Sequence, residues 1–445
     1  MMSSLFSAVS GLKAQQTSLD VIANNIANVN TTGYKSQRVT FSDLLSQTLS
    51  SASGSTATKG GTNAVQVGLG VSIASTDTIM TVGSTQSTGV ATDLSISGSG
   101  FFIVQGGSVG EYQFTRNGSM DVDESGNLTI GGYKVCGWLD YTVDADGNYV
   151  YNTDAEVEPI NIYSDDNGNK KVIAAEATTA AAFSGNLDPS ASVATNATAL
   201  NDIGDTTDLE FDQTSSMTVF DAQGNSYDVT TNWKKCYVDD STDTTSWYYE
   251  ISSEDMSVSP ASGYITFDAS GKLITTDADY NTTPTITLSP TTAGTSAFDV
   301  SLDFSDISTY TSSSSASVTA TANGYEAGEL QSISISSNGT ISGAYSNGQT
   351  QSLGMIALAT FANPEGLEKV GSNLYAVSAN SGKFNAVVAG SGGSGSLSSG
   401  TLEMSNVDLA SQFSSMMISQ RAYQANSKVI STADEMLQSL INMAG

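Results

Sequence analysis

Both ends of the 445-residue chain carry an apolar repeat with a spacing of seven residues, and this pattern limits the possible fold most. Near the N-terminus the repeat consists of Leu5, Leu12, Leu19 and Ile26. Near the C-terminus it consists of Leu409, Met416, Tyr423, Ile430 and Leu437. Such spacing places the side chains on one face of an amphipathic helix, as in a coiled coil. We therefore predict one helix that ends near residue 30 and another from about Asp408 to Asn442.

The two predicted helices are terminal, and a long stretch of chain separates them. Because each has one apolar face to bury, we expect them to pair with each other and to turn their outward faces to other copies. Isolated helices of this length are marginally stable in water, so we expect them to order fully on assembly. The alternative interpretation is that both are ordinary core helices of one globule.

The middle of the chain has the pattern of short β-strands. Apolar, β-prone segments such as 101–104 and 355–361 alternate with turn pairs such as Asn117-Gly118 and Asn338-Gly339. This alternation is typical of antiparallel sandwiches and barrels. Residues 46–64 and 390–400 are rich in Ser, Thr and Gly and are predicted linkers. The predicted fold class is α+β and mainly β, with antiparallel outer domains inserted between paired, coiled-coil-like terminal helices.

The chain is strongly acidic, with 15 basic and 45 acidic side chains and a net charge of −30. The first 100 residues carry four basic and four acidic side chains and the last 45 carry two basic and four acidic ones, so a net charge of −28 lies in the middle of the chain. Nucleic-acid binding requires a basic surface, which this composition opposes. We expect no membrane-spanning segment and no cleaved signal peptide, because the required apolar runs are not seen.

The composition gives little support to an enzyme. Histidine, the commonest general base near neutral pH, does not occur in the chain. Asp121, Asp123 and Gly126 match the first half of a calcium loop, but Gly132 occupies the position that requires a bidentate glutamate. Paired carboxylates such as Asp239-Asp240 are expected to be solvated turns. We therefore predict no catalytic residue, no cofactor and no metal.

The two cysteines, Cys136 and Cys236, are far apart in the sequence, and each follows a lysine-containing segment. Their spacing indicates neither a metal site nor a disulfide framework. We expect two partly buried thiols, although a nearby cation can lower the pKa of a thiol.

Both ends of the sequence resemble the signatures of the bacterial flagellar rod and hook proteins. The N-terminal resemblance lies in 23–28 and 32–35, and the C-terminal one lies in 405–409 and 420–426. Segments 96–104, 114–118, 343–348 and 354–366 are similar to the inner globular domain of that family. Segment 220–233 resembles the outer-domain block of hook proteins and favours a hook protein over a shorter rod protein.

We divide the chain on this basis into an inner domain, linkers and two β-rich regions. The inner terminal-helix domain is 1–34 with 405–445, the linkers are 35–75 and 389–404, the inner globular domain is 76–145 with 322–388, and the outer domain is 146–321, as one or two subdomains.

The resemblance implies a structural subunit that polymerises into a curved, flexible helical tube, which acts as a universal joint and transmits torque from rod to filament. It also implies type III export and an extracellular position attached to the basal body. The implied partners are further copies of the chain, a distal rod protein, a hook cap protein, a hook-filament junction protein and the export apparatus. The alternatives are a distal rod protein, a secreted β-rich adhesin and a secreted glycosidase.

We predict that self-assembly depends on heptad positions and on unusual polar residues of the two helices. Asparagine is uncommon inside helices because it competes for backbone hydrogen bonds, so it either bonds to another subunit or to the linker, or caps a helix end. Arg421 is expected to pair with a carboxylate or carbonyl of a neighbour. The predicted residues are Leu5, Leu12, Leu19, Asn24, Asn25, Ile26, Asn28, Phe413, Met416, Gln420, Arg421, Tyr423, Ile430 and Leu437.

By resemblance to some spirochaete hooks, a cysteine could also be crosslinked to a lysine of an adjacent subunit. The sequence leaves open whether Cys136 or Cys236 takes part.

Overall fold

The chain forms two compact units. The computed structural model describes residues 2–55, 58–107, 110–144, 149–165, 168–197, 202–204, 209–274, 283–291, 294–311 and 317–444. The first unit comprises Met1–Lys170, Ser332–Ala344 and Thr350–Gly445, and the second comprises Lys171–Gln331 and Tyr345–Gln349. Each unit is therefore built from separate stretches of the sequence.

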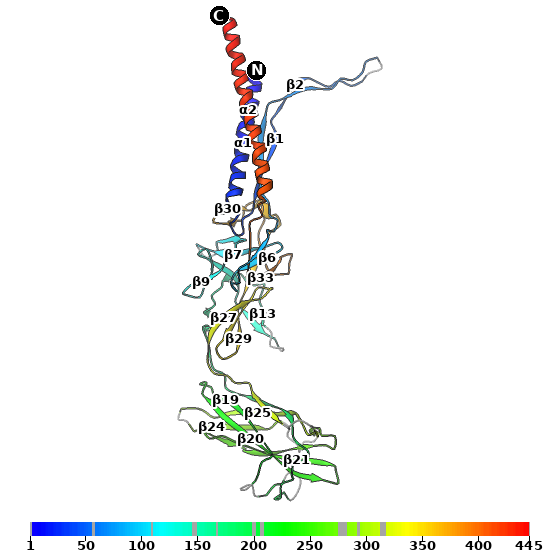
Figure 1. Ribbon diagram of the computed structural model, residues 1–445, viewed down its shortest axis with the longest axis vertical. Helices are drawn as coiled ribbons and strands as arrows, with labels where there is room; N and C mark the ends of the chain where they lie inside the picture. The colour runs from blue at the N-terminus through cyan, green and yellow to red at the C-terminus, as the bar shows by residue number, and fades with distance from the viewer. Residues whose placement is uncertain are drawn as a thin grey trace. The chain divides into compact units, whose positions relative to one another are not determined.

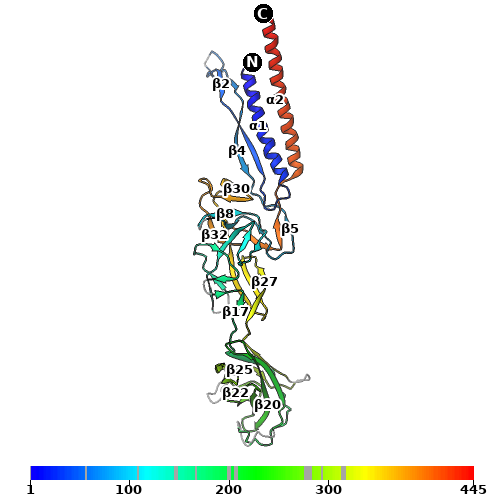
Figure 2. The same cartoon turned by 90° about the vertical axis from the view of Figure 1, so that its left-hand side faces the viewer.

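The first unit contains the two terminal helices, α1 (Met2–Ala27) and α2 (Leu409–Ala444). They lie side by side and run antiparallel, with both chain termini at the same end of the pair (Figures 1 and 2). Helix α2 begins where the Asp408 carboxylate accepts a hydrogen bond from the backbone N–H of Ala410 at 2.9 Å. Such a cap satisfies a donor that the first helical turn leaves unpaired.

Two long strands accompany helix α1. Strand β1 (Gln37–Asp43) pairs antiparallel with β4 (Val71–Thr78), and β2 (Ser46–Ser50) pairs with β3 (Val65–Gly68). The predicted linker at 46–64 therefore begins with a strand of a β-ladder. Its Ser and Thr side chains are compatible with extended backbone, and all five residues of β2 are exposed. Figure 1 shows this ladder projecting from the side of the helix pair.

The body of the first unit is an antiparallel sheet that both halves of the sequence build. Its strands follow the order β28 (Thr340–Tyr345), β29 (Thr350–Thr360), β11 (Tyr133–Trp138), β7 (Phe101–Gln105), β8 (Tyr112–Thr115), β31 (Leu374–Ala376) and β30 (Glu368–Gly371). Strand β29 also pairs directly with β7. The core beneath the sheet is aromatic, and Phe361 meets Phe101 and Phe114 at centroid distances of 5.7 and 4.8 Å.

Shorter strands complete the first unit. They are β9 (Asp121–Val122) with β10 (Leu128–Ile130), β14 (Glu158–Pro159) on β11, β32 (Asn385–Val388) on β29, β5 (Thr85–Ser87) with β34 (Thr401–Glu403), β6 (Leu94–Ser97) with β33 (Ser396–Ser399), β12 (Tyr141–Val143) with β13 (Tyr149–Tyr151), and β15 (Ser164–Asp165) with β16 (Gly168–Asn169). Strands β13 and β14 fall within 146–321, the predicted outer domain, but they belong to the first unit, because they pair with β12 and β11.

The second unit consists mainly of two sheets that share one core. One sheet has the order β22 (Met256–Ser259), β24 (Thr285–Pro290), β25 (Phe298–Ser308), β18 (Ala180–Asn186) and β26 (Val318–Ala322). The other has the order β19 (Gln213–Phe220), β20 (Ser226–Asp239), β21 (Thr244–Ser252) and β23 (Ser262–Phe267). The pairs are antiparallel apart from β18 with β25, which is parallel. A further pair, β17 (Val172–Ile173) with β27 (Gly328–Ile335), continues the large sheet, in which β27 stands next to β28.

Large aromatic side chains fill the space between these two sheets. Phe304 of one sheet is fully buried and lies 5.6 Å from Trp233 of the other, measured between ring centroids. Phe183 and Tyr249 each lie 5.0 Å from Phe304. The fold class is therefore α+β and mainly β, as predicted.

We expect Phe304→Ala to reduce the free energy of unfolding of the second unit by about 3–5 kcal/mol, because it leaves a cavity among three aromatic rings. Urea unfolding followed by tryptophan fluorescence measures this. The exposed Val193 provides the control, and Val193→Ala is expected to change the stability by less than about 0.5 kcal/mol. Equal effects of the two substitutions would contradict this account of the core.

Candidate assembly interface and the junction beneath it

The surface between α1 and α2 is lined by small and polar side chains. Gly11 faces Asn426 so closely that an added Cβ would lie 2.7 Å from its Nδ2 atom. The hydroxyl oxygens of Ser18 and Ser419 are 3.4 Å apart. Ala8, Ala14 and Ala433 of the two helices are also buried. Small residues let the two helix backbones approach closely, so the contact depends on shape rather than on large apolar side chains.

The predicted heptad residues flank this contact instead of filling it. The half-buried ones are Leu5, Leu12, Leu19, Ile26, Met416, Ile430 and Leu437, while Phe413 and Tyr423 are exposed. On α2 the side chains nearest α1 follow a second repeat of seven, formed by Gln412, Ser419, Asn426 and Ala433. Its members are small or polar, so a search for apolar periodicity misses them. The spacing itself was the signal that could have found them.

A large part of the outward helix surface is apolar. Ile418 is 67% exposed and Phe6 is 65% exposed, although both are large hydrophobic side chains. Exposed apolar surface of this kind marks interaction sites in soluble proteins. The further exposed apolar residues of the pair are Val9, Leu409, Phe413, Met417, Tyr423, Val429, Met436, Ile441 and Met443.

Asn25 is fully buried and connects three elements of its own chain. Its Nδ2 donates to the backbone oxygen of Gln37 at 2.7 Å and to Oε1 of Gln412 at 3.2 Å. Its Oδ1 accepts from the Gln37 N–H at 2.9 Å and from the Tyr34 hydroxyl at 3.2 Å. The side chain thus joins α1 to β1 and α2. Its hydrogen bonds lie within the subunit, and the contact with β1 matches the predicted contact with the linker.

The other predicted polar residues lie closer to solvent. The Asn28 amide donates to the backbone oxygen of Asn24 at 2.9 Å and to its Oδ1 at 2.8 Å. It thereby supplies a hydrogen-bond donor to a carbonyl in the last turn of α1. This is the helix-end role that the sequence left open. Gln420 and Arg421 are exposed on α2. A pairing of Arg421 with a neighbouring subunit stays a prediction.

Below the helices, three charged side chains meet in the interior of the first unit. The carboxylate of Glu403 accepts hydrogen bonds from Lys35 Nζ at 2.6 Å, from Arg116 Nη1 at 3.1 Å and from the Gly83 backbone N–H at 2.9 Å. The exposed fractions of the three side chains lie between 0 and 3%. Buried charges are tolerated only when they are paired and hydrogen-bonded. We call these three residues the junction cluster.

The two cations of the junction cluster also donate to backbone carbonyls. Lys35 Nζ donates to the Thr81 oxygen at 2.7 Å, and Arg116 Nη2 donates to the Gly98 oxygen at 2.8 Å. Burial lowers the pKa of Lys35, while its hydrogen bond and attraction to Glu403 raise it. Burial likewise lowers the pKa of Arg116, and Glu403 opposes that shift. The cluster contains two cations and one anion.

Hydrogen bonds to backbone groups around the cluster connect the segment that follows α1 with the segment that precedes α2. The Gly33 N–H donates to the Glu403 carbonyl oxygen at 2.8 Å. Asn406 accepts from the Ser36 N–H at 2.8 Å and donates to the Ile79 oxygen at 2.9 Å. Lys369 Nζ donates to the Lys35 carbonyl oxygen at 3.0 Å, and burial lowers the pKa of Lys369 to about 8. The segments that leave α1 and enter α2 are therefore bonded to one another and to the sheet.

Both cysteines are fully buried in their own subunit. Burial raises the pKa of Cys136 to about 12 and also raises the pKa of Cys236. The reactive thiolate is therefore scarce at neutral pH, in spite of the neighbouring lysines.

The carboxylates singled out in the sequence serve turns. Both oxygens of Asp123 accept from Asn127, from its backbone N–H and from its side-chain amide, at 2.7 Å each. Asp239 accepts from the Ser241 N–H at 2.8 Å. Among the described residues, no group of three or more His, Cys, Asp or Glu side chains is placed to hold a metal ion. No helix in the described part of the chain is long and apolar enough to cross a membrane.

Comparison with known proteins agrees with this arrangement. Three domain families match the chain: "Flagella basal body rod protein" at 5–35, "Flagellar basal body protein FlaE D2 domain" at 186–325 and "Flagellar basal body rod FlgEFG protein C-terminal" at 398–443. The first and last matches cover the two helices, and the middle one falls in the second unit. This combination defines the class of flagellar rod and hook proteins.

Sequence identity to individual relatives separates hook proteins from rod proteins within this class. The flagellar hook protein FlgE of Treponema pallidum is 37% identical over 480 aligned residues, with 100% of both chains covered. The flagellar basal-body rod protein FlgG of Bacillus subtilis is 30% identical, with 100% of this chain and 99% of that protein covered. A solved structure of Helicobacter pylori flagellar hook protein FlgE2 covers 70% of this chain and 98% of its own, at 14% identity and a TM-score of 0.47. The chain belongs to the flagellar hook protein FlgE family and is a structural subunit of the hook.

The junction cluster leads to a prediction about stability. Glu403→Gln removes the single anion and leaves two buried cations, so we expect the first unit to lose about 3–5 kcal/mol. Hydrogen exchange of the backbone around Gly83, Gly98 and Arg116 measures the loss. Glu435→Gln on the exposed face of α2 is the control and is expected to leave these rates unchanged. Unchanged exchange in Glu403→Gln would show that the cluster is not a stabilising contact.

The cysteines lead to a prediction about reactivity. A thiol with a pKa of about 12 is almost fully protonated at pH 8, whereas a free thiol has a pKa of about 8.5. We expect iodoacetamide to modify native Cys136 at least about a thousand times more slowly than the urea-unfolded chain. The rate should rise with pH towards 12, and mass spectrometry measures it. Rapid labelling of the folded subunit at pH 8 would contradict this.

Proposed function

We propose that the subunit polymerises through the outward faces of α1 and α2 into a curved, flexible helical tube. The main observation in favour is the exposed apolar surface of the helix pair, of which Ile418 is the clearest example. Burying a side chain of this size contributes about 1.5–3 kcal/mol. Contacts between unlike surfaces that do not close into a ring produce a helical polymer. Such a tube would serve as a universal joint that transmits torque from rod to filament.

The junction cluster supports the mechanical part of this proposal. Torque has to pass between the helices and the sheet of the same subunit, and Glu403 links the segments that join them. A buried, charge-assisted contact resists shear better than an exposed polar contact, because breaking it leaves charges without partners. The acidic middle of the chain favours outer contacts that are polar and able to slide, which bending requires.

We further infer the export route, the location and the partners of the subunit from its family. The subunit would be exported by the flagellar type III apparatus without a cleaved signal peptide and would lie outside the cell, attached to the basal body. Its partners would be the distal rod protein, the hook cap protein during assembly and the hook-filament junction protein. An enzymatic role receives no support, because the relatives are named as hook and rod proteins. The adhesin and glycosidase alternatives have no support from the family either.

The assembly proposal is tested with Ile418→Asp, which places a charge on the outward surface of α2. We expect the variant to form no tubes at concentrations where the parent chain does, in electron micrographs of protein concentrated in a kosmotropic salt. Near-ultraviolet circular dichroism should stay the same, since the β-sheets do not depend on this residue. Ser427→Asp, at an exposed polar position of the same helix, is the control. Tubes formed equally well by Ile418→Asp would falsify the proposal, and straight tubes from the parent chain would favour the rod.

A further inference from the structure

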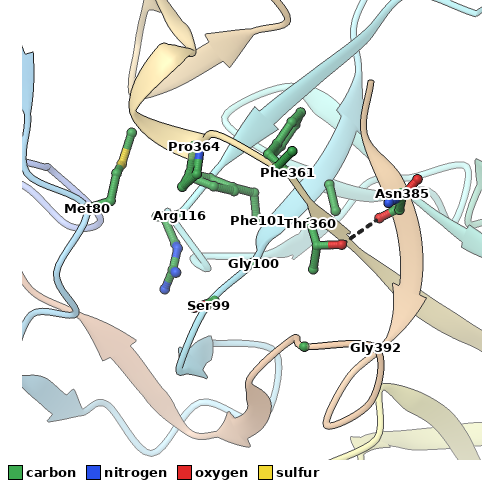
Figure 3. A pocket seen from close by; sticks show the side chains of 13 residues that line it. Met80, Ser99, Gly100, Phe101, Arg116, Thr360, Phe361, Pro364, Asn385 and Gly392 are labelled. Carbon is green, nitrogen blue, oxygen red and sulfur yellow. Dashed lines mark hydrogen bonds between the residues drawn. The ribbon is translucent and has the colours of Figure 1, made fainter. Parts of the chain in front are cut away.

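A pocket with a volume of about 390 Å³ opens in the first unit, beside the junction cluster. Apolar side chains on its walls include Met80, Phe101, Phe361 and Pro364, while Ser99, Thr360 and Asn385 contribute polar groups. Figure 3 shows these side chains together with Arg116 around the same space. The pocket therefore combines aromatic walls with a guanidinium group.

Arg116 is 3% exposed, and its hydrogen bonding is incomplete. Its Nη atoms donate to Glu403 and to the Gly98 carbonyl, and its guanidinium carbon lies 5.3 Å from the centre of the Phe101 ring. Its Nε is buried without an acceptor in the described part of the chain. An unpaired buried donor costs free energy, and the junction cluster carries one positive charge in excess. An anionic group bound in the pocket beside the guanidinium would offset this excess positive charge.

The same chain exposes a segment of complementary chemistry at the end of β1. Leu45 is 78% exposed, Phe41 is 43% exposed and Leu44 is 41% exposed. Asp43 lies between them, is exposed, and has no side-chain partner among the described residues. By contrast, Asp408, which also stands beside exposed apolar residues, already caps α2. Segment 41–45 thus offers apolar side chains together with an unoccupied carboxylate.

The segment cannot fill the pocket of its own subunit. Strand β1 begins at Gln37, which pairs with Thr78, two residues before the pocket residue Met80. Asp43 is the last residue of this extended strand, so it lies about 20 Å further along. The occupant has to come from another copy.

We propose that the pocket beside Arg116 accepts segment 41–45 of a second copy of the chain. The Asp43 carboxylate of that copy accepts a hydrogen bond from Arg116, and its Leu45 packs against the pocket walls at Met80 and Phe361. The proposal rests on the self-assembly function and deepens it by naming a specific pair of surfaces. Because pocket and segment are different surfaces, each copy can bind one neighbour and be bound by another, which extends a helical polymer.

Crosslinking tests the contact directly. Chains with Leu45→Cys and chains with Ala362→Cys, which lines the pocket, are distinguished by tags of different length and assembled together. Mild oxidation is expected to produce a disulfide-linked heterodimer on a non-reducing gel. Ala91→Cys, at an exposed position, replaces Ala362→Cys as the control and is expected to give none. Each variant assembled alone identifies any homodimer, and the buried native cysteines stay unreacted.

A second measurement does not depend on disulfide geometry. Asp43→Asn is expected to raise the critical concentration for polymerisation about tenfold or more, because a charge-assisted hydrogen bond is lost. Asp306→Asn, an exposed carboxylate of the second unit, is the control.

The inference is overturned if tubes form without the heterodimer and Asp43→Asn assembles like the parent chain. A heterodimer between Ala362→Cys and Val143→Cys, another exposed apolar position beside a carboxylate, would assign the pocket to a different segment and also overturn it. Either result would leave self-assembly intact. A parent chain that forms no tubes at all would instead count against the proposed function.

Discussion

The rest of the first unit depends on the buried carboxylate of Glu403. Two cations and a backbone N–H bind it, and they come from the segment after α1, from the end of β8 and from the segment after β4. Glu403 itself ends β34, a few residues before α2. One side chain therefore joins the approaches to both helices to the sheet. Because each partner is almost fully buried, the contact is not screened by solvent or salt.

The helix pair above this junction divides its surface between two tasks. Small and polar residues such as Gly11, Ser18 and Asn426 face the partner helix and set a close approach. The large apolar side chains are left at the flanks or outside, where a monomer gains little from them. This division is suited to a polymer, since the strongest apolar contacts become available only when copies meet. In the proposed contact, the pocket beside Arg116 and segment 41–45 are likewise brought together only when two copies meet.

Much of this organisation could be predicted from the sequence, because periodicity and turn residues act locally. The two helices, the antiparallel strands of the middle and the family were all accessible in this way. The inward repeat that contains Ser419 and Asn426 was missed, because hydrophobicity does not mark small and polar residues. The predicted division between residues 145 and 146 differs from the two units, since β13 pairs with β12 and β14 pairs with β11 of the sheet of the first unit.

The sequence by itself determined the two terminal helices, the β-rich character and acidity of the middle, and the membership of the hook protein family, since each depends on neighbouring residues or on composition. Tertiary structure alone decided that Lys35, Arg116 and Glu403 meet, because 368 and 287 positions separate the two cations from Glu403. It also decided that Asn25 bonds within its own subunit and that both thiols are buried. Contacts between distant segments depend on how sheets and helices pack, and no local pattern records that packing.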